Sequence, residues 1–115
     1  MGHRVSVHRT RVARWGEALA ADFLRRRGAR VLGRNLRHGR GEIDLLVAFG
    51  SRRVAVEVKT RVGDPADPVE AFDAHKARRV RTAANAIAGP GTRVDLVAVS
   101  VGADGVQVRW VPGAA

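Results

Sequence analysis

The feature that most constrains the fold is a pair of alternating segments separated by two residues. Residues 42–49 (EIDLLVAF) and 52–61 (RRVAVEVKTR) are rich in β-branched and other apolar residues, and Gly50-Ser51 lies between them. A two-residue loop that begins with glycine is typical of a tight β-hairpin. We therefore expect an antiparallel strand pair whose register follows from the turn.

This register predicts that two carboxylates face each other. Counting outward from the turn pairs Asp44 with Glu57 and Glu42 with Lys59. Directly opposed like charges destabilise a sheet, so something should compensate for the acid pair. A divalent cation held by both carboxylates is one answer, because oxygen ligands suit Mg²⁺. The alternative is an ion-pair cluster on a solvated face, in which these acids, Lys59 and Arg61 neutralise one another.

The opposite face of the same hairpin is apolar. Successive side chains of a strand point to opposite faces, so the residues that alternate with the charged ones form the expected core face. They are Ile43, Leu45, Val47, Val54, Val56 and Val58.

The remaining pattern predicts one α/β domain in the order α-β-β-β-α-β-β. The expected helices cover residues 14–27 and 74–88, and the expected strands cover 29–37, 42–49, 52–61, 93–101 and 106–111. Residues 1–13 are expected to form a basic arm that is flexible or adds an edge strand. Residues 62–73 are expected to be a loop with at most one helical turn. We place the domain at 14–111 and a tail at 112–115.

The charge of the chain indicates a polyanionic partner. Lys and Arg number 21 against 11 Asp and Glu, a formal net charge of +10. Nucleic acid is the common partner of such a surface. An acidic protein or a membrane surface would suit the same charge, although no long basic amphipathic helix supports a membrane. A GC-rich genome, which favours Arg codons, is a further source of the excess.

Other compositional features exclude whole classes of site. The chain has no Cys, which rules out disulfides, thiolate zinc sites and thiol nucleophiles. It has no apolar run long enough to span a bilayer, and its first residues lack the apolar stretch of a signal peptide. These features predict a cytoplasmic protein without a membrane partner.

Each predicted helix carries one charged residue beside its apolar stripe. Glu17 lies at the edge of the first stripe, where its side chain can extend toward the acid pair as a third carboxylate. The alternative is that it is a first-turn acid favoured by the helix dipole. Lys76 lies four residues before Val80 on the second stripe and either reaches the same site or extends outward to solvent. Lys59 and Lys76 are the two lysines of a chain that otherwise uses Arg.

Together these residues resemble a known nuclease superfamily. Glu17, Asp44 and the run Glu57-Val58-Lys59, in the order helix, strand, strand, resemble the PD-(D/E)XK nucleases. More narrowly, the chain resembles the YraN-like family of uncharacterised bacterial proteins. The segments that carry this resemblance are GE-x-x-A (16–20), RN-x-R (34–37), GEIDLL (41–46), VEVKTR (56–61), Lys76 and Arg79.

The resemblance implies a fold and a set of roles. The fold would be restriction-endonuclease-like, with a mixed central sheet flanked by helices, similar to archaeal Holliday junction resolvases and the tRNA-intron endonuclease domain. Asp44, Glu57 and Glu17 would bind Mg²⁺ or Mn²⁺, and Lys59 would be the catalytic lysine. Because resolvase-like enzymes act as dimers, the analogy also points to a homodimer.

We therefore expect a divalent-metal-dependent endonuclease that hydrolyses DNA phosphodiesters, with branched DNA in repair or recombination among its candidate substrates. Basic residues are expected to contact the nucleic-acid backbone. They are Arg34, Arg37, Arg40, Arg61, Lys76 and Arg79. Two alternatives stay open: a non-catalytic nucleic-acid-binding module on the same fold, and an interaction subunit for an acidic partner.

Overall fold

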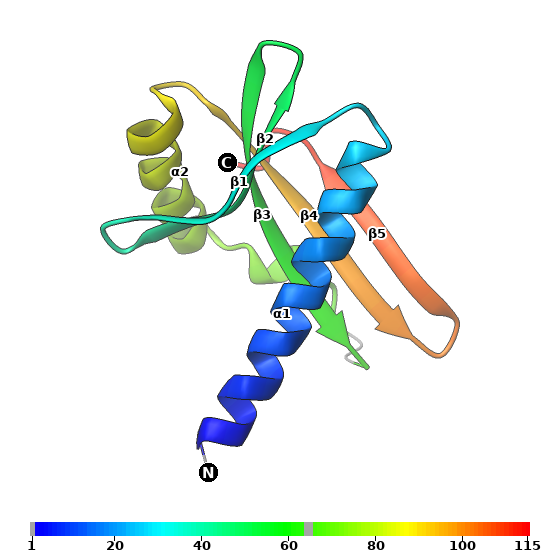
Figure 1. The fold of residues 1–115 in the computed structure, drawn as a ribbon. Helices are drawn as coiled ribbons and strands as arrows, with labels where there is room; N and C mark the ends of the chain where they lie inside the picture. The colour runs from blue at the N-terminus through cyan, green and yellow to red at the C-terminus, as the bar shows by residue number, and fades with distance from the viewer. Residues whose placement is uncertain (1, 64–65) are drawn as a thin grey trace.

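A computed structural model describes residues 2–63 and 66–115, with side chains described from residue 10 onward; residues 64–65 of the predicted loop and Met1 lie outside the described part. The elements follow the predicted order (Figure 1). They are α1 (Gly2–Arg25), β1 (Arg30–His38), β2 (Gly41–Phe49), β3 (Arg52–Val62), the 3₁₀ turn η1 (Pro68–Ala71), α2 (Ala74–Ala88), β4 (Arg93–Gly102) and β5 (Gly105–Val111). Within the described residues, no helix has the length and apolar character needed to cross a membrane.

The five strands form one mixed sheet in chain order. Neighbouring strands are antiparallel except β3 and β4, which run parallel. A parallel pair needs a crossover connection, and the segment containing η1 and α2 supplies it. The predicted class, a mixed central sheet flanked by two helices, is confirmed.

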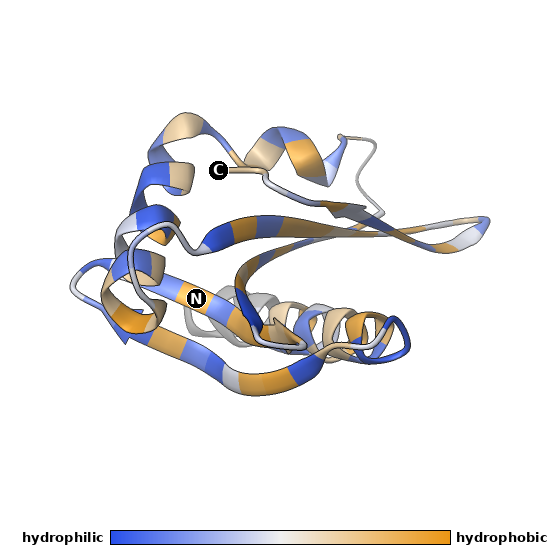
Figure 2. Cartoon of the chain, turned by 90° about the horizontal axis from the view of Figure 1, so that it is seen from above, coloured by the Kyte–Doolittle hydropathy of each residue, from blue (hydrophilic) through white to orange (hydrophobic). Residues whose placement is uncertain are grey.

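The helices pack on opposite faces of this sheet. On one face, Ala20, Ala21 and Leu24 of α1 pack against the valines of β3 and β4. On the other, Val80 and the neighbouring alanines of α2 pack against a second apolar cluster. Residues 43–48 of β2 and 94–99 of β4 are buried without interruption, and Figure 2 shows hydrophobic stretches along the strands. Because successive side chains of a strand point to opposite faces, each of these strands contributes to both cores.

The predicted core face of the hairpin is correct except at one position. Leu45, Val47, Val54, Val56 and Val58 pack under α1, as expected. The prediction for Ile43 is wrong, because this residue lies in the α2 cluster. The ladder between β2 and β3 ends at the Leu45–Val56 pair, and before that point β2 turns with β1 toward α2. A strand that bends in this way no longer keeps the alternation of its flat part.

The first helix is longer than its apolar stripe predicts. It begins at Gly2, so the expectation that residues 2–13 form a flexible arm or an edge strand is wrong. The alternating valines there favoured a strand, but the segment contains no Pro and is rich in Arg, a good helix former, so the helix extends through it. The helix ends at Arg25, two residues before the predicted end at 27, and a turn leads from there to Gly28, whose φ is 96°.

The predicted tail is held against the sheet by Asp95, whose side chain is fully buried. The Asp95 carboxylate accepts two hydrogen bonds from the Arg93 guanidinium at 2.8 and 2.9 Å, one from the Trp110 indole N–H and one from the Gly113 amide. The Ala114 amide also donates to the Val94 carbonyl at 2.8 Å. A charge buried among so many donors ties β4, β5 and residues 112–115 together.

Candidate functional site

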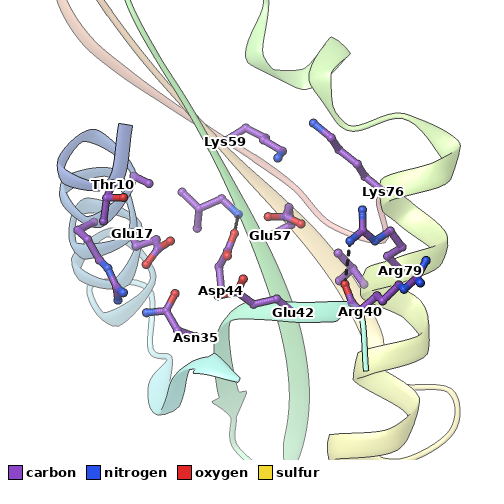
Figure 3. Close-up of a pocket in the computed structure, with 14 residues that line it drawn as sticks. Thr10, Glu17, Asn35, Arg40, Glu42, Asp44, Glu57, Lys59, Lys76 and Arg79 are labelled. Atoms are coloured by element: carbon purple, nitrogen blue, oxygen red, sulfur yellow. Dashed lines mark hydrogen bonds between the residues drawn. The ribbon is translucent and has the colours of Figure 1, made fainter. Parts of the chain in front are cut away.

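A cleft of about 450 Å³ lies where β2 and β3 separate. Helix α1 forms one wall, the β1–β2 hairpin and α2 form the other, and β3 crosses the floor (Figure 3). Its lining is mostly charged. The lining residues are Thr10, Ala13, Arg14, Glu17, Asn35, Arg40, Glu42, Asp44, Glu57, Val58, Lys59, Lys76, Arg79 and Val80.

Asp44 and Glu57 both lie in this cleft, as predicted, but not through the backbone pairing that was predicted. The register is correct from Phe49–Arg52 to Leu45–Val56, but the ladder ends there, so the predicted backbone pairs of Asp44 with Glu57 and of Glu42 with Lys59 do not form. Instead, the Val58 amide donates to the Asp44 carboxylate at 2.8 Å. The side chains of Asp44 and Glu57 both line the cleft and are close enough for Glu57 to raise the pKa of Asp44.

The electrostatics of Asp44 show that this pair attracts a positive charge. Burial, the hydrogen bond with Glu57 and the negative charge of Glu57 raise the pKa of Asp44 to about 8. The Val58 amide and Lys59 act in the opposite direction and are too weak to cancel these effects. Two carboxylates that are held together disfavour double ionisation, so either a proton or a cation should lie between them.

The donor set fits a magnesium-type ion. Mg²⁺ is usually bound by one or two carboxylates and keeps several waters, and Asp44 and Glu57 provide two. No group of three or more His, Asp or Glu side chains in the described part of the chain is arranged to hold a metal. Glu17 thus lies beside the Asp44–Glu57 pair in this structure. The pair itself is the set of ligands that fits Mg²⁺.

A close helix contact brings Glu17 to the cleft. A Cβ atom on Gly16 would lie only 1.9 Å from Oγ1 of Thr60 on β3, so this position admits glycine alone without a shift. The neighbouring Glu17 is half-buried, and burial followed by the negative charge of Asp44 raises its pKa. Hydrogen bonding from Asn35 and the charge of Arg14 lower it. Glu17 therefore lies near the acid pair, as predicted.

The β1–β2 hairpin closes the opposite wall through another glycine. A Cβ atom on Gly41 would lie 2.5 Å from the Arg79 carbonyl oxygen and 3.0 Å from Cβ of Ala83. The Arg79 guanidinium also donates to the Arg40 carbonyl at 2.9 Å (Figure 3). The hairpin tip is thus clamped onto α2, and the side chains of Arg40 and Arg79 line the wall.

The two lysines of the chain meet across the cleft. Lys59 extends from β3 and Lys76 from the first turn of α2, and their side chains point toward each other in Figure 3. Asp73 caps this turn by accepting the Lys76 amide at 2.9 Å. The positive charge of Lys59, and to a lesser extent burial, lower the pKa of Lys76. Two facing ammonium groups beside an acid pair favour an anionic ligand with several oxygens.

The structure places half of the predicted backbone-contact residues at the cleft. Arg40, Lys76 and Arg79 line it, whereas Arg34, Arg37 and Arg61 do not belong to the lining. Arg34 is exposed, and the Arg37 guanidinium lies 3.9 Å from the Glu42 carboxylate.

Sequence reasoning did not assign a role to Arg14 or Asn35. Arg14 lies three residues before Glu17 on one helix face, a spacing that identifies neighbours on a helix surface. Asn35 interrupts a predicted strand, where Asn is disfavoured. Both features are visible in the sequence, but each occurs often in proteins. Neither indicates a role at the site until the structure shows the cleft.

Comparison with known proteins decides the family. The model of the uncharacterised protein family UPF0102 matches residues 16–99, most of the chain. The chain belongs to this family. The resemblance to YraN-like bacterial proteins is therefore confirmed.

Relatives of the UPF0102 family match nearly end to end. The UPF0102 protein of Roseiflexus castenholzii is 40% identical, and the match covers 90% of this chain and 92% of the relative. The UPF0102 protein of Syntrophotalea carbinolica is 36% identical, with 96% and 95% covered. That of Methylococcus capsulatus is 38% identical, with 93% and 92% covered. Eleven of the fourteen residues that line the cleft lie within the family match, and Thr10, Ala13 and Arg14 precede it.

Proposed function

We propose that this UPF0102 protein is a divalent-metal-dependent endonuclease that hydrolyses phosphodiester bonds of DNA. The observation that carries the proposal is that Asp44, Glu57 and Lys59 line one cleft, with Glu57 near enough to raise the pKa of Asp44. This is the acid, acid and lysine set of the PD-(D/E)XK nucleases, supplied here by neighbouring strands that separate at the site.

Each group of the set has a distinct task. Asp44 and Glu57 would hold Mg²⁺ or Mn²⁺, with the Val58 amide fixing the orientation of the Asp44 carboxylate. When bound, such an ion polarises a phosphoryl oxygen and lowers the pKa of water. The Lys59 ammonium lies two residues beyond Glu57 and stabilises negative charge that develops on the phosphate. Lys76 faces it from α2 and binds a second phosphate oxygen or the neighbouring phosphate.

The basic wall favours recognition of the backbone over recognition of bases. Arg40, Arg79 and Lys76 lie on one side of the cleft, and Arg14 lies on the other. Contacts from such residues to phosphates fix the position of a nucleic acid without reading its sequence. The chain has 4% aromatic residues and no Tyr, so base stacking is a poor mode of binding. We therefore propose duplex or branched DNA as the substrate.

Cleavage of a labelled panel tests the proposal. Duplex, flap, four-way junction, single-stranded DNA and RNA are incubated with Mg²⁺, Mn²⁺ or EDTA. The wild type should cut duplex or branched DNA in the presence of metal. Glu57→Ala should lower the rate by about 10²–10³-fold, the range for removing one preorganised electrostatic group. Glu70→Ala is the matched control, since Glu70 is an exposed acid outside the cleft.

Other outcomes lead to other functions. DNA binding that is equal in the wild type and Glu57→Ala, without cutting under any metal, would replace the nuclease with a non-catalytic binding module. Preferential cutting of RNA would overturn the substrate class alone. The homodimer stays a prediction by analogy, and sedimentation of the protein with a four-way junction tests it.

A further inference from the structure

Asn35 has an unusual backbone for a strand residue. Its φ is 52°, and among the described residues it is the one non-glycine residue with positive φ. The left-handed region is costly for most side chains and tolerated best by Asn and Asp. The β1–β2 register shifts between Val31 and Gly33, shortly before this residue. A strained residue that lines a cleft is a reason to look for a function.

The Asn35 amide on β1 joins groups from two other elements, α1 and β2. With the amide oriented by its neighbours, its nitrogen donates to Oε1 of Glu17 on α1 and to Oε1 of Glu42 on β2, both at 3.2 Å. Its oxygen accepts from Nη1 of Arg14 at 2.6 Å. Both amide hydrogens are thus used on carboxylates, and the carbonyl oxygen is used on a cation. A side chain with this pattern of donors and acceptor matches its surroundings completely.

The two acids reach Asn35 from backbones that are already fixed. Each follows a glycine that makes a close contact: Gly16 lies against Thr60 of β3, and Gly41 lies against α2. Two Gly-Glu pairs, one on a helix and one on a strand, therefore direct their carboxylates to the same amide. Without a donor between them, two neighbouring carboxylates would repel each other and turn apart.

We propose that Asn35 is a positioning residue, whose amide holds Glu17 and Glu42 together at the rim of the cleft so that Glu17 faces the Asp44–Glu57 pair. The proposal rests on the proposed nuclease function for its consequence, although the amide contacts themselves are independent of any activity. It also explains the left-handed backbone, because that conformation turns the amide of an edge-strand residue into the cleft.

The Asn35→Gly variant tests the side-chain amide independently of the backbone conformation. Glycine adopts positive φ freely, so this substitution keeps the conformation and removes the donor. We expect a Tm within a few degrees of wild type and a kcat for DNA cleavage that falls about 10–100-fold, the range for losing a group that supports a metal site from outside its ligands. KM for DNA should change less than about twofold, because the substitution removes no side chain that is proposed to contact the DNA phosphates.

A second variant and a control sharpen this test. Asn35→Asp keeps the shape but sets a third carboxylate against two, so its kcat should fall further than that of Asn35→Gly. Asn85→Ala removes an exposed Asn of α2 outside the cleft and should leave kcat unchanged. Wild-type kcat in both Asn35 variants would overturn the proposal, as would a loss of kcat that is matched by a loss of folded protein.

Hydrogen exchange of side-chain amides tests the contact without an activity assay. The sequence contains three carboxamide side chains, at Asn35, Asn85 and Gln107, so their NMR signals are easily assigned. Asn85 and Gln107 are exposed. The Asn35 NH₂ hydrogens should exchange at least about tenfold more slowly than those of Asn85, and Glu17→Gln should shift their resonances.

The two failures are distinguishable. If the Asn35 hydrogens exchange as fast as those of Asn85, the positioning role is wrong even in an active nuclease. If they are protected in a protein that cuts no substrate, the nuclease proposal fails and the amide contact stands.

Discussion

The buried acid pair predicts that an Asp44→Asn variant is more stable than the wild type at high pH. The folded-state pKa of Asp44 is raised to about 8, above its usual 3.8, because the carboxyl group is buried against Glu57. A raised pKa means that stabilisation is complete below pH 4 and is lost as the pH rises through about 8. Asn resembles the protonated acid at every pH, so it keeps that stabilisation. It also keeps the acceptor for the Val58 amide.

The magnitude follows from the two pKa values. Between 3.8 and about 8, at about 1.36 kcal/mol per pKa unit, ionising the folded wild type costs up to about 5–6 kcal/mol. Burying the Asn amide returns about 1–3 kcal/mol of this. We expect Asp44→Asn to raise the free energy of unfolding by about 3 kcal/mol at pH 9, or Tm by about 10 °C in a domain of this size. At pH 4 the ionisation cost is absent, so the same amide burial should leave Asp44→Asn about 1–3 kcal/mol less stable than the wild type.

Urea and thermal unfolding at pH 4, 7 and 9 measure this difference, with EDTA present so that no cation replaces the proton. Asp104→Asn is the control, since Asp104 is exposed in the β4–β5 turn and should give no pH-dependent difference. Glu57→Gln should reproduce part of the gain at pH 9, because it removes the partner charge. An Asp44→Asn effect that is the same at pH 4 and pH 9, or a loss of stability at pH 9, would show that ionisation of Asp44 does not destabilise the fold.

Three further predictions concern packing and metal. Gly16→Ala should lower the free energy of unfolding by about 1–3 kcal/mol, since its Cβ would meet Oγ1 of Thr60 at 1.9 Å, and Thr60→Ala should restore part of the loss in urea unfolding. Asp95→Ala should cost about 3–5 kcal/mol, because it leaves the partly buried Arg93 charge without its carboxylate; a change in urea midpoint below 1 M would contradict this. Mg²⁺ at about 100 times its Kd should stabilise the wild type by about 2.7 kcal/mol, and Glu57→Ala should abolish the shift in Tm.

Local rules predicted the regular parts of this fold. The Gly50-Ser51 turn gave the hairpin register as far as Leu45–Val56, and Gly50 has the positive φ, 61°, that the turn requires. The bounds of α2 are those predicted, because Asp73 caps its start and Gly89 its end. Signals of this kind depend on a few neighbouring residues, so they are readable from one sequence.

The main residues of the site were predicted from the sequence, but the strand geometry that brings them together was not. Alternation brought Asp44, Glu57 and Lys59 to one face, and the helical stripes added Glu17 and Lys76; all five line the cleft. What alternation does not contain is the separation of β2 and β3, which depends on how the β1–β2 hairpin packs on α2.

Asn35 is a second example of a feature that local sequence patterns do not predict. Its contacts come from α1 and β2, both remote in the sequence, and its left-handed backbone contradicts the local strand pattern. Residues at which tertiary packing overrides a local preference are the ones that sequence reasoning places last, and they tend to lie at functional sites.

A side-by-side cleavage assay of the wild type and Asp44→Asn tests directly whether the acid pair supports hydrolysis of DNA. Because Asp44→Asn is expected to be the more stable protein at neutral pH, unfolding does not explain a loss of activity. We expect the wild type to cut duplex or branched DNA with Mg²⁺ or Mn²⁺ and to stop with EDTA, whereas folded Asp44→Asn should bind the same DNA and leave it intact. Equal cutting by both proteins would contradict the role of the acid pair, and binding by both without cutting would contradict the nuclease.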